Sequence, residues 1–367
     1  MNRPDFADRW RRLTDRLSAA GADALLLGGG ADLEYLTGYH AMPLERLTAL
    51  VGRTDDERPT LLVPELERAR VTPNDAFTTI TWSELENPVT RALEVLGGCS
   101  SVVISDDLWA THVLSLTRQR PELEVRTVAE SIVGIRAVKA PAEMEALQAV
   151  GALADKVMAQ VQDGTIPLVG RTEAEIATSI SEQLLAVGHE SVQFVIVASG
   201  PNSASPHHHP GDRVVERNEM VLFDFGGTHA GYNSDTTRCV HTGPIPDDVR
   251  AAYDALMEAQ QRAVEAATTG NRLCDVDIAA RSVLSDAGHG EAFVHRTGHG
   301  IGTEVHEQPY VTGANTAPIE VGHAFSIEPG VYYEGRWGMR LEDIVVIGRD
   351  GDAIRCNHSI RELIELD

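Results

Sequence analysis

Four carboxylates and one histidine occur in this chain within short segments that otherwise resemble buried strands or glycine-rich turns. They are Asp224 and Asp235 in DFGGTHAGYNSDTTR, His299 in HRTGHGIG, Glu328 in SIEPG and Glu342 in MRLED. A carboxylate on an apolar strand is costly to bury unless a partner compensates its charge. Four carboxylates and one imidazole form a hard, oxygen-rich ligand set. If all five converge, they can hold two divalent cations about 3.5 to 4 Å apart.

The composition predicts a globular protein with two domains. The chain has 367 residues, of which 43% are hydrophobic, and this length exceeds the usual size of one domain. Its formal net charge of −24 argues against nucleic acid and anionic membranes as partners, because both require a cationic face.

The cysteines predict neither a disulfide framework nor a structural zinc motif, because all four are scattered without a CxxC spacing. The first residues, MNRPDFADRW, contain no apolar core of the signal-peptide kind, and eighteen apolar residues nowhere run without interruption. We therefore expect a cytoplasmic protein in a reducing compartment that is neither exported nor membrane-spanning.

The first third of the chain alternates helical and strand-like segments, which is typical of an α/β domain. Near residue 136 the sequence reads RAVKAP, and Pro141 begins a long helical pattern. The predicted domains are therefore 1–135 and 136–367, in an α+β chain. Within the first domain we expect a helix over Phe6–Ala20 and strands over Ala24–Leu27, Leu47–Val51, Thr60–Val63 and Val102–Ser105.

The second predicted domain repeats one order of elements. A helix from Pro141 is followed by a capping box at Thr172–Glu175, a second helix ending at Gly188, and the strand-like VQFVIVAS. A helix from Pro246 is followed by a second one ending at Gly288 and by another short strand signal. Few positions are identical, so two unrelated helical hairpins are the alternative to a pseudo-two-fold duplication.

The segment around Asp224 predicts a hairpin that pairs two acids. VLFDF alternates in character, so Asp224 shares a strand face with Leu222. Glycines 226, 227 and 231 allow the chain to turn, and residues 233–240 can return antiparallel, bringing Asp235 beside Asp224. The alternative is that both acids satisfy backbone groups of a turn.

Glycines flank His299 in GHGIG, which permits close backbone approach and leaves the ring accessible. His295 and His306 lie near it in the sequence, although a single histidine is more often structural. Arg340 and Glu342 are expected on one strand face, where the guanidinium can orient a ligating carboxylate. A surface ion pair is the alternative for these two residues.

These motifs, in this order, resemble the pita-bread metallopeptidase family. It includes methionine aminopeptidase, aminopeptidase P, prolidase and, without metal, creatinase. The resemblance covers about residues 136–365, and ADLEYLTGY in the first domain is similar to the creatinase-type amino-terminal domain. It implies a creatinase-type α/β domain followed by a pseudo-two-fold pita-bread catalytic domain.

The resemblance also implies two divalent metal ions per subunit, with Mn as the first choice and Co or Zn as alternatives. Asp235 and Glu342 would bridge the two ions. The implied set of metal ligands is Asp224, Asp235, His299, Glu328 and Glu342.

For the substrate, the resemblance implies that His207, in SGPNSASPHHHP, faces the peptide and that His306 contacts the scissile amide. His295 matches a further active-site histidine. Glu328 is the implied proton shuttle, and Arg340 is the implied partner of a ligating carboxylate. The two histidines after His207 receive no role, and their run could instead be a surface metal-binding tract.

The implied reaction is hydrolysis of Xaa-Pro bonds in dipeptides by a hydroxide that bridges the two metals. The expected partner is a small peptide with proline at the second position, and a homodimer is expected. An Xaa-Pro aminopeptidase acting on longer peptides is the alternative, and Tyr310 stands where some prolidases carry a basic residue. A creatinase-like hydrolase is disfavoured because that branch lacks the ligands kept here, and a non-catalytic binding module is the remaining alternative.

Overall fold

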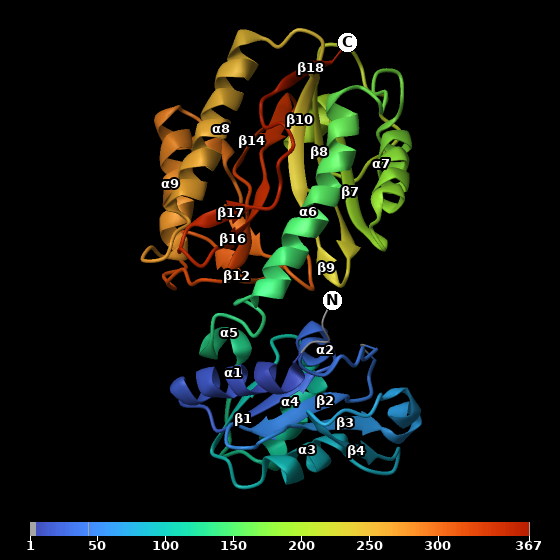
Figure 1. Ribbon diagram of the computed structural model, residues 1–367, viewed down its shortest axis with the longest axis vertical. Coiled ribbons are helices and arrows are strands. Elements are labelled where there is room, and N and C mark those ends of the chain that lie inside the picture. The colour runs from blue at the N-terminus through green and yellow to red at the C-terminus, as the bar shows by residue number, and fades with distance from the viewer. Residues whose placement is uncertain (1–4, 43, 367) are drawn as a thin grey trace. The chain divides into compact units, whose positions relative to one another are not determined.

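The computed structural model describes residues 5–42 and 44–366 of the chain. The chain divides into two compact units, Met1–Arg136 and Ala137–Asp367, so the division falls after residue 136, where the sequence predicted 135. Both units combine helices with sheets (Figure 1). The α+β fold class is therefore confirmed.

The first unit contains one mixed sheet with the strand order β4-β3-β2-β1-β5-β6. The predicted helix and the four predicted strands are all present, with ends shifted by at most two residues. The elements are α1 (Phe6–Ala19), β1 (Ala24–Gly28), α2 (Ala31–Thr37), β2 (Ala49–Arg53), β3 (Thr60–Pro64), η1 (Glu65–Arg70), β4 (Thr78–Trp82), α3 (Pro88–Leu96), β5 (Ser101–Ile104), α4 (Ala110–Gln119), β6 (Glu124–Thr127) and α5 (Val128–Ser131).

Strand β1 separates two apolar cores in this unit. Leu25 and Leu27 pack with residues of α1 and α2 on one face of the sheet. Ala24 and Leu26 pack with residues of α3 and α4 on the other face. Successive side chains of a strand point to opposite faces, so a strand covered by helices on both faces is apolar throughout.

The second unit has the predicted order of helix, helix and strand in both halves, as α6-α7-β7 and α8-α9-β11. Its elements are α6 (Pro141–Gln162), α7 (Glu173–Val187), β7 (Ser191–Ser199), η2 (Gly200–Ala204), β8 (Met220–His229), β9 (Tyr232–Asn233), β10 (Thr236–Thr242), α8 (Asp247–Ala266), α9 (Leu273–Asp286), η3 (Gly290–Ala292), β11 (Gly298–Gly300), β12 (Glu307–Val311), β13 (Ala324–Ile327), β14 (Gly330–Tyr333), β15 (Trp337–Arg340), β16 (Asp343–Ile347), β17 (Ala353–Arg355) and β18 (Ile364–Leu366).

Local signals determine where these helices begin and end. Pro141 occupies the first turn of α6, where its missing N–H costs no helical hydrogen bond. Thr172 and Glu175 form the predicted capping box at the start of α7. Gly188 ends α7 with a left-handed φ of 119°, a conformation that favours glycine.

The two halves of the second unit pack against each other through their sheets. One sheet has the order β18-β10-β8-β7 and the other β12-β11-β13-β16-β17. Along β8, Val221 and Phe223 pack with α6 and α7, whereas Leu222 belongs to the core formed with α8, α9 and the second sheet. In Figure 1, α8 and α9 accordingly lie on one side of the strands and α7 on the other. Asp224 shares the face of Leu222, as predicted, and therefore faces the other half.

The hairpin after Asp224 turns at Gly231, as predicted, but differs from the prediction in the role of Gly226 and Gly227. Strand β8 continues through Gly226 and Gly227, and the chain turns at Ala230 and Gly231, where φ is 52° and 80°. A Cβ atom on Gly226 would lie 2.0 Å from the carbonyl oxygen of Ser234. Glycine is thus required at 226 for close packing of two backbones and not for turning.

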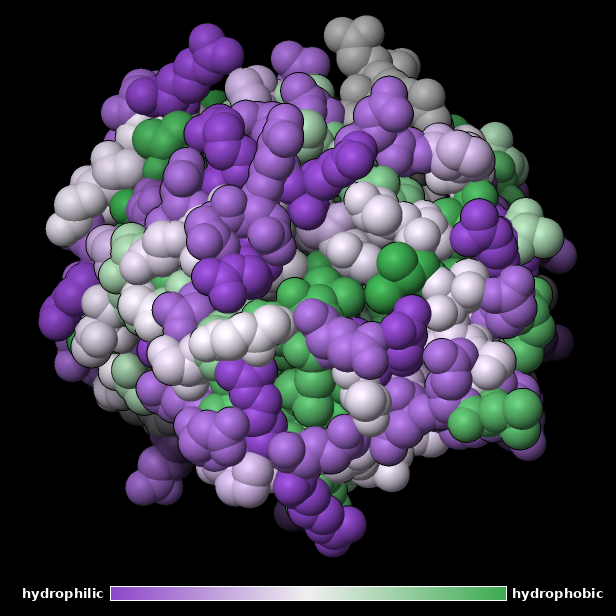
Figure 2. Space-filling model, turned by 90° about the horizontal axis from the view of Figure 1, so that it is seen from below, coloured by the Kyte–Doolittle hydropathy of each residue, from purple (hydrophilic) through white to green (hydrophobic). Residues whose placement is uncertain are grey.

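The surface is largely hydrophilic on the face that is shown (Figure 2). Figure 2 shows a face on which hydrophilic side chains dominate, with a smaller hydrophobic area near its middle. Among the helices that the structure describes, none is both long enough and apolar enough to cross a membrane.

Candidate metal centre and active site

The structure brings all five predicted ligands together in the second unit. One group comprises Asp224, Asp235 and Glu342, and a second comprises His299, Glu328 and Glu342. Within each group, one potential ligand atom from every residue lies within 4.8 Å of the others. The two groups share Glu342, so they form one continuous cluster.

Strand pairing explains this convergence. Thr237 of β10 lies opposite Asp224 of β8, so Asp235, which directly precedes β10, returns beside Asp224. In the other half, Ile327 of β13 pairs with Asp343 of β16. Glu328 and Glu342, each one residue beyond that pair, consequently lie at the same edge of the sheet.

Backbone contacts on both sides of His299 explain its flanking glycines. A Cβ atom on Gly298 would lie 1.8 Å from the Ser326 carbonyl oxygen, and one on Gly300 would lie 2.4 Å from the Gln308 carbonyl carbon. The predicted close approach is therefore present. The predicted accessibility is wrong, because the packing that requires glycine also leaves the His299 side chain buried.

The hydrogen bonds of His299 leave one ring nitrogen available as a ligand. Nδ1 donates to the Gly300 carbonyl oxygen at 3.1 Å. Nε2 lies 3.6 Å from Asp235 Oδ2 and 3.4 Å from Glu328 Oε1. Burial, and then the charges of His306 and Arg296, lower the pKa of His299 to about 3. The ring is therefore neutral near pH 7, and the Nε2 lone pair is free for a cation.

Three of the carboxylates each have one oxygen atom that the protein leaves without a partner. Within the described part of the chain, Asp224 Oδ1, Asp235 Oδ1 and Glu342 Oε1 are buried without a hydrogen-bond partner. Burial, followed by repulsion from neighbouring carboxylates, raises the pKa of Asp235 and of Glu342 well above the usual range. Burial raises the pKa of Glu328 to about 7. Buried anions in such a group require a cation, so these residues fit hard divalent metal ions.

Arg340 contacts a different carboxylate from the one predicted. Its Nη2 donates to Asp224 Oδ2 at 2.6 Å, and its side chain is only 3% exposed, so the contact is not a surface ion pair. Glu342 is held instead by Thr237, whose hydroxyl donates to Glu342 Oε2 at 2.7 Å and accepts from Arg340 Nε at 3.1 Å. The sequence analysis missed Thr237, because nothing in the sequence distinguishes it from the neighbouring Thr236.

A hydrogen-bonded chain connects His295 to Arg340. Arg340 Nη1 donates to the Tyr332 hydroxyl at 2.8 Å, and that hydroxyl donates to His295 Nε2 at 2.8 Å. Burial and the charge of Arg340 lower the pKa of His295 to about 4, so its ring is neutral. His295 therefore lies beside the ligand cluster, and Tyr332 is a second residue that the sequence analysis missed.

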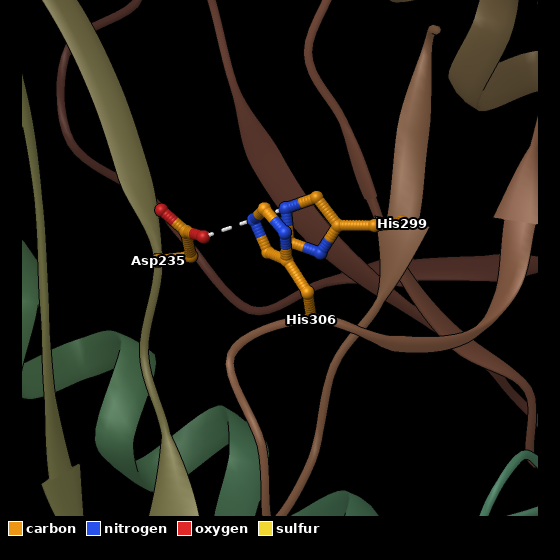
Figure 3. A group of neighbouring side chains, drawn as sticks. All are labelled: Asp235, His299 and His306. Carbon is orange, nitrogen blue, oxygen red and sulfur yellow. Dashed lines mark ion pairs between the residues drawn. The ribbon is translucent and has the colours of Figure 1, made fainter. Parts of the chain in front are cut away.

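His306 and His207 lie on the open side of the cluster. His306 is exposed, and its ring centroid is 3.8 Å from that of His299. Figure 3 shows both rings beside Asp235, and the three residues form a further group with ligand atoms within 4.8 Å. His207 is exposed, and its charge lowers the pKa of both His295 and His306. These two histidines can meet a substrate that enters from solvent.

Comparison with known proteins decides the family. The description "Metallopeptidase family M24" matches residues 145–349, and "Creatinase/Prolidase N-terminal domain" matches residues 9–138. The chain belongs to metallopeptidase family M24. It is a metal-dependent peptidase by family, with the pita-bread fold, and the family implies divalent metal ions.

Full-length relatives of this M24 chain carry dipeptidase names. A protein of Mycobacterium bovis named probable dipeptidase PepE is 42% identical, covering 98% of this chain and 97% of the relative. An Xaa-Pro dipeptidase of Lactobacillus delbrueckii is 35% identical, covering 93% and 94%. The crystal structure of dipeptidase PepE from Mycobacterium ulcerans matches with a TM-score of 0.92 and 40% identity, covering both chains completely.

A buried carboxylate anchors the loop that carries His207 in this M24 protein. Glu173, at the start of α7, accepts hydrogen bonds from the backbone and hydroxyl of Ser199, from Asn202 and from the Gly211 N–H. His208 Nε2 lies 2.7 Å from Glu173 Oε2. His208 is therefore part of this anchor and not of a surface metal-binding tract.

Replacing Glu173 with alanine will destabilise the protein by about 2–4 kcal/mol, because several buried donors lose their acceptor. Peptidase activity will fall as the His207 loop loosens, while metal content stays unchanged. Urea unfolding and metal analysis measure these effects. Glu175→Gln, at the exposed capping box of the same helix, is the matched control and will cost less than about 1 kcal/mol. Equal losses in both variants would contradict the anchor.

Proposed function

We propose that the protein hydrolyses Xaa-Pro dipeptides. The observation that carries the proposal is the cluster of five metal-ligand side chains with buried, unpartnered carboxylate oxygens. The names of its relatives, dipeptidase and Xaa-Pro dipeptidase, support the choice of substrate. An Xaa-Pro bond has no N–H for an ordinary peptidase to bind, so a dedicated site is needed.

The proposed cofactors are two Mn ions per subunit, with Co or Zn as alternatives. Bound metal would supply Lewis-acid polarisation of the peptide carbonyl and lower the pKa of water. The four carboxylates and the absence of cysteine from the ligand set favour Mn or another hard cation, and the single imidazole also suits Zn. Asp224, Asp235, His299, Glu328 and Glu342 would hold the ions.

The protein's own residues have distinct proposed roles. His306 donates a hydrogen bond to the scissile carbonyl oxygen, and His207 contacts the peptide from the other exposed loop. Glu328 accepts the proton of the attacking water and delivers it to the proline nitrogen, which must be protonated before it leaves. Arg340 orients Asp224 through a hydrogen bond, and the Tyr332–His295 pair holds Arg340 in position.

The test compares hydrolysis of Ala-Pro and Ala-Pro-Ala by metal-stripped protein reconstituted with Mn, Co or Zn. Preferential cleavage of Ala-Pro is expected. A preference for Ala-Pro-Ala would instead make the protein an Xaa-Pro aminopeptidase, the second candidate. Two bound metals without either activity would refute the substrate class and leave the metal centre standing.

Replacing Thr237 with valine will weaken metal binding about 10- to 100-fold, because the Glu342 carboxylate loses the hydroxyl that orients it. Calorimetric titration of metal-free protein with Mn measures the change. Thr236→Val is the matched control, because the Thr236 hydroxyl is buried without a hydrogen-bond partner. An unchanged affinity in Thr237→Val would show that Glu342 needs no orientation.

We further propose a homodimer in the cytoplasm. The four cysteines, which are free and buried, agree with a reducing compartment. Light scattering of the purified protein tests the dimer, and a monomeric mass at micromolar concentration would refute it.

A further inference from the structure

Arg296 is a cationic side chain next to His306, one of the exposed histidines of the centre. It lies in the segment before β11, and its Nη2 is 3.4 Å from His306 Nδ1. Its guanidinium carbon lies 4.2 Å from the centroid of the Tyr310 ring. Stacking on an aromatic face fixes the guanidinium plane and leaves the N–H groups at its edge free to donate.

The neighbouring arginines form ion pairs with carboxylates, whereas Arg296 does not among the described residues. Arg340 pairs with Asp224 at 2.6 Å, and Arg281 pairs with Asp277 at 2.8 Å. Among the described residues, no carboxylate forms an ion pair with Arg296, although the chain carries a net charge of −24. The side chain is half-buried, and its charge lowers the pKa of His306 and of Glu328. An unpaired cation therefore stands where a substrate reaches the centre.

We propose that Arg296 binds the free α-carboxylate of the substrate's proline and thereby makes the site select dipeptides. This inference rests on the proposed function, in which His306 contacts the scissile amide. A guanidinium and a carboxylate form paired, charge-assisted hydrogen bonds. In a longer peptide an uncharged amide stands at the same place, so this contact is lost.

The covalent geometry of a dipeptide fits the spacing of the two side chains. The scissile carbonyl carbon and the proline carboxylate carbon are three bonds apart, at most about 4.3 Å along the chain. A substrate whose carbonyl meets His306 consequently places its carboxylate close to a group 3.4 Å from that histidine. Tyr310 cannot neutralise a carboxylate itself, but it supports the residue that can.

A purely structural role for Arg296 predicts a different outcome. If Arg296 only orients His306, replacing Arg296 lowers kcat/KM for every substrate to the same extent. If Arg296 binds the carboxylate, its replacement lowers kcat/KM only for substrates that carry a free carboxylate. The comparison of Ala-Pro with Ala-Pro-amide separates these roles, because the two molecules differ only at the carboxylate.

The experiment measures kcat/KM for both substrates with the Mn-loaded protein and with Arg296→Gln, Arg296→Lys and Arg349→Gln. For Arg296→Gln we expect a fall of about 10- to 100-fold with Ala-Pro, mainly through KM, and a change within about twofold with the amide. Arg296→Lys keeps the charge but not the fork, so we expect a smaller fall confined to Ala-Pro. Arg349→Gln removes the same charge from an exposed turn and will behave as wild type.

Metal content and circular dichroism establish that each variant is folded and loaded. An equal fall in kcat/KM with both substrates in Arg296→Gln would overturn the role of Arg296 and leave the proposed function intact. If the glutamine variant does not fold, the same result in Arg296→Lys has the same meaning. A wild-type protein that cleaves neither substrate would overturn both. Selective loss of Ala-Pro cleavage is the result that supports the inference.

Discussion

Replacing Asp235 with alanine will abolish peptide hydrolysis and the binding of metal ions in their normal number per chain. The fold will remain largely intact. Asp235 is one of the five proposed ligands and belongs to the group with Asp224 and Glu342, so its loss removes a ligand from the proposed metal centre. Loss of Lewis-acid chemistry removes several kcal/mol of transition-state stabilisation, which corresponds to a fall in kcat/KM of at least about 1,000-fold. Elemental analysis and hydrolysis of Ala-Pro measure the two effects.

Circular dichroism will show the native helical content in Asp235→Ala, because the change removes an unpaired charge and not a part of the apolar core. Asp286→Ala is the matched control, since it removes an exposed carboxylate at the end of α9. Full activity and an unchanged metal count in Asp235→Ala would refute the site.

Metal-free protein will lose stability as the pH rises from about 4.5 to about 7, in contrast to the usual behaviour of proteins rich in paired carboxylates. Burial raises the pKa of Glu328 from its ordinary 4.5 to about 7. Between these values the folded state binds more protons than the unfolded state, so the free energy of unfolding falls with rising pH. The loss is on the order of 3 kcal/mol for this residue. The raised pKa values of Asp235 and Glu342 act in the same direction.

The measurement is urea unfolding of metal-free wild type and metal-free Glu328→Gln between pH 4.5 and 8. Glutamine does not titrate, so the difference in unfolding free energy between the two proteins isolates the contribution of Glu328. We expect wild type to lose stability relative to the variant across this range. A difference in unfolding free energy that stays constant across this pH range, or that changes in favour of wild type as the pH rises, would contradict the raised pKa of Glu328.

Several features could be predicted because neighbouring residues in the chain determine them. The alternation of VLFDF fixes the face of Asp224, since side chains on a strand have a period of two. The capping box at Thr172 and the left-handed glycine at 188 determine where α7 begins and ends. The candidate ligands could be selected for the same reason, because each stands in a short motif.

Other features could not be predicted, because their partners come from remote segments. Arg340 was expected to orient Glu342, two residues away, but it contacts Asp224 on another strand. Gly226 was read as a turn residue, whereas the Ser234 carbonyl oxygen excludes any side chain there. Thr237 and Glu173 acquire their roles only from groups that folding brings to them.

The sequence by itself determined the chemistry that is available: a hard ligand set without cysteine, a two-domain α+β chain, and the ends of its main helices. Only the tertiary structure decided which groups meet, which are buried and therefore which protonation states they take. The physical reason is that secondary structure depends on neighbours along the chain. Desolvation and Coulomb interactions depend on distances through space, which the packing of the two halves sets.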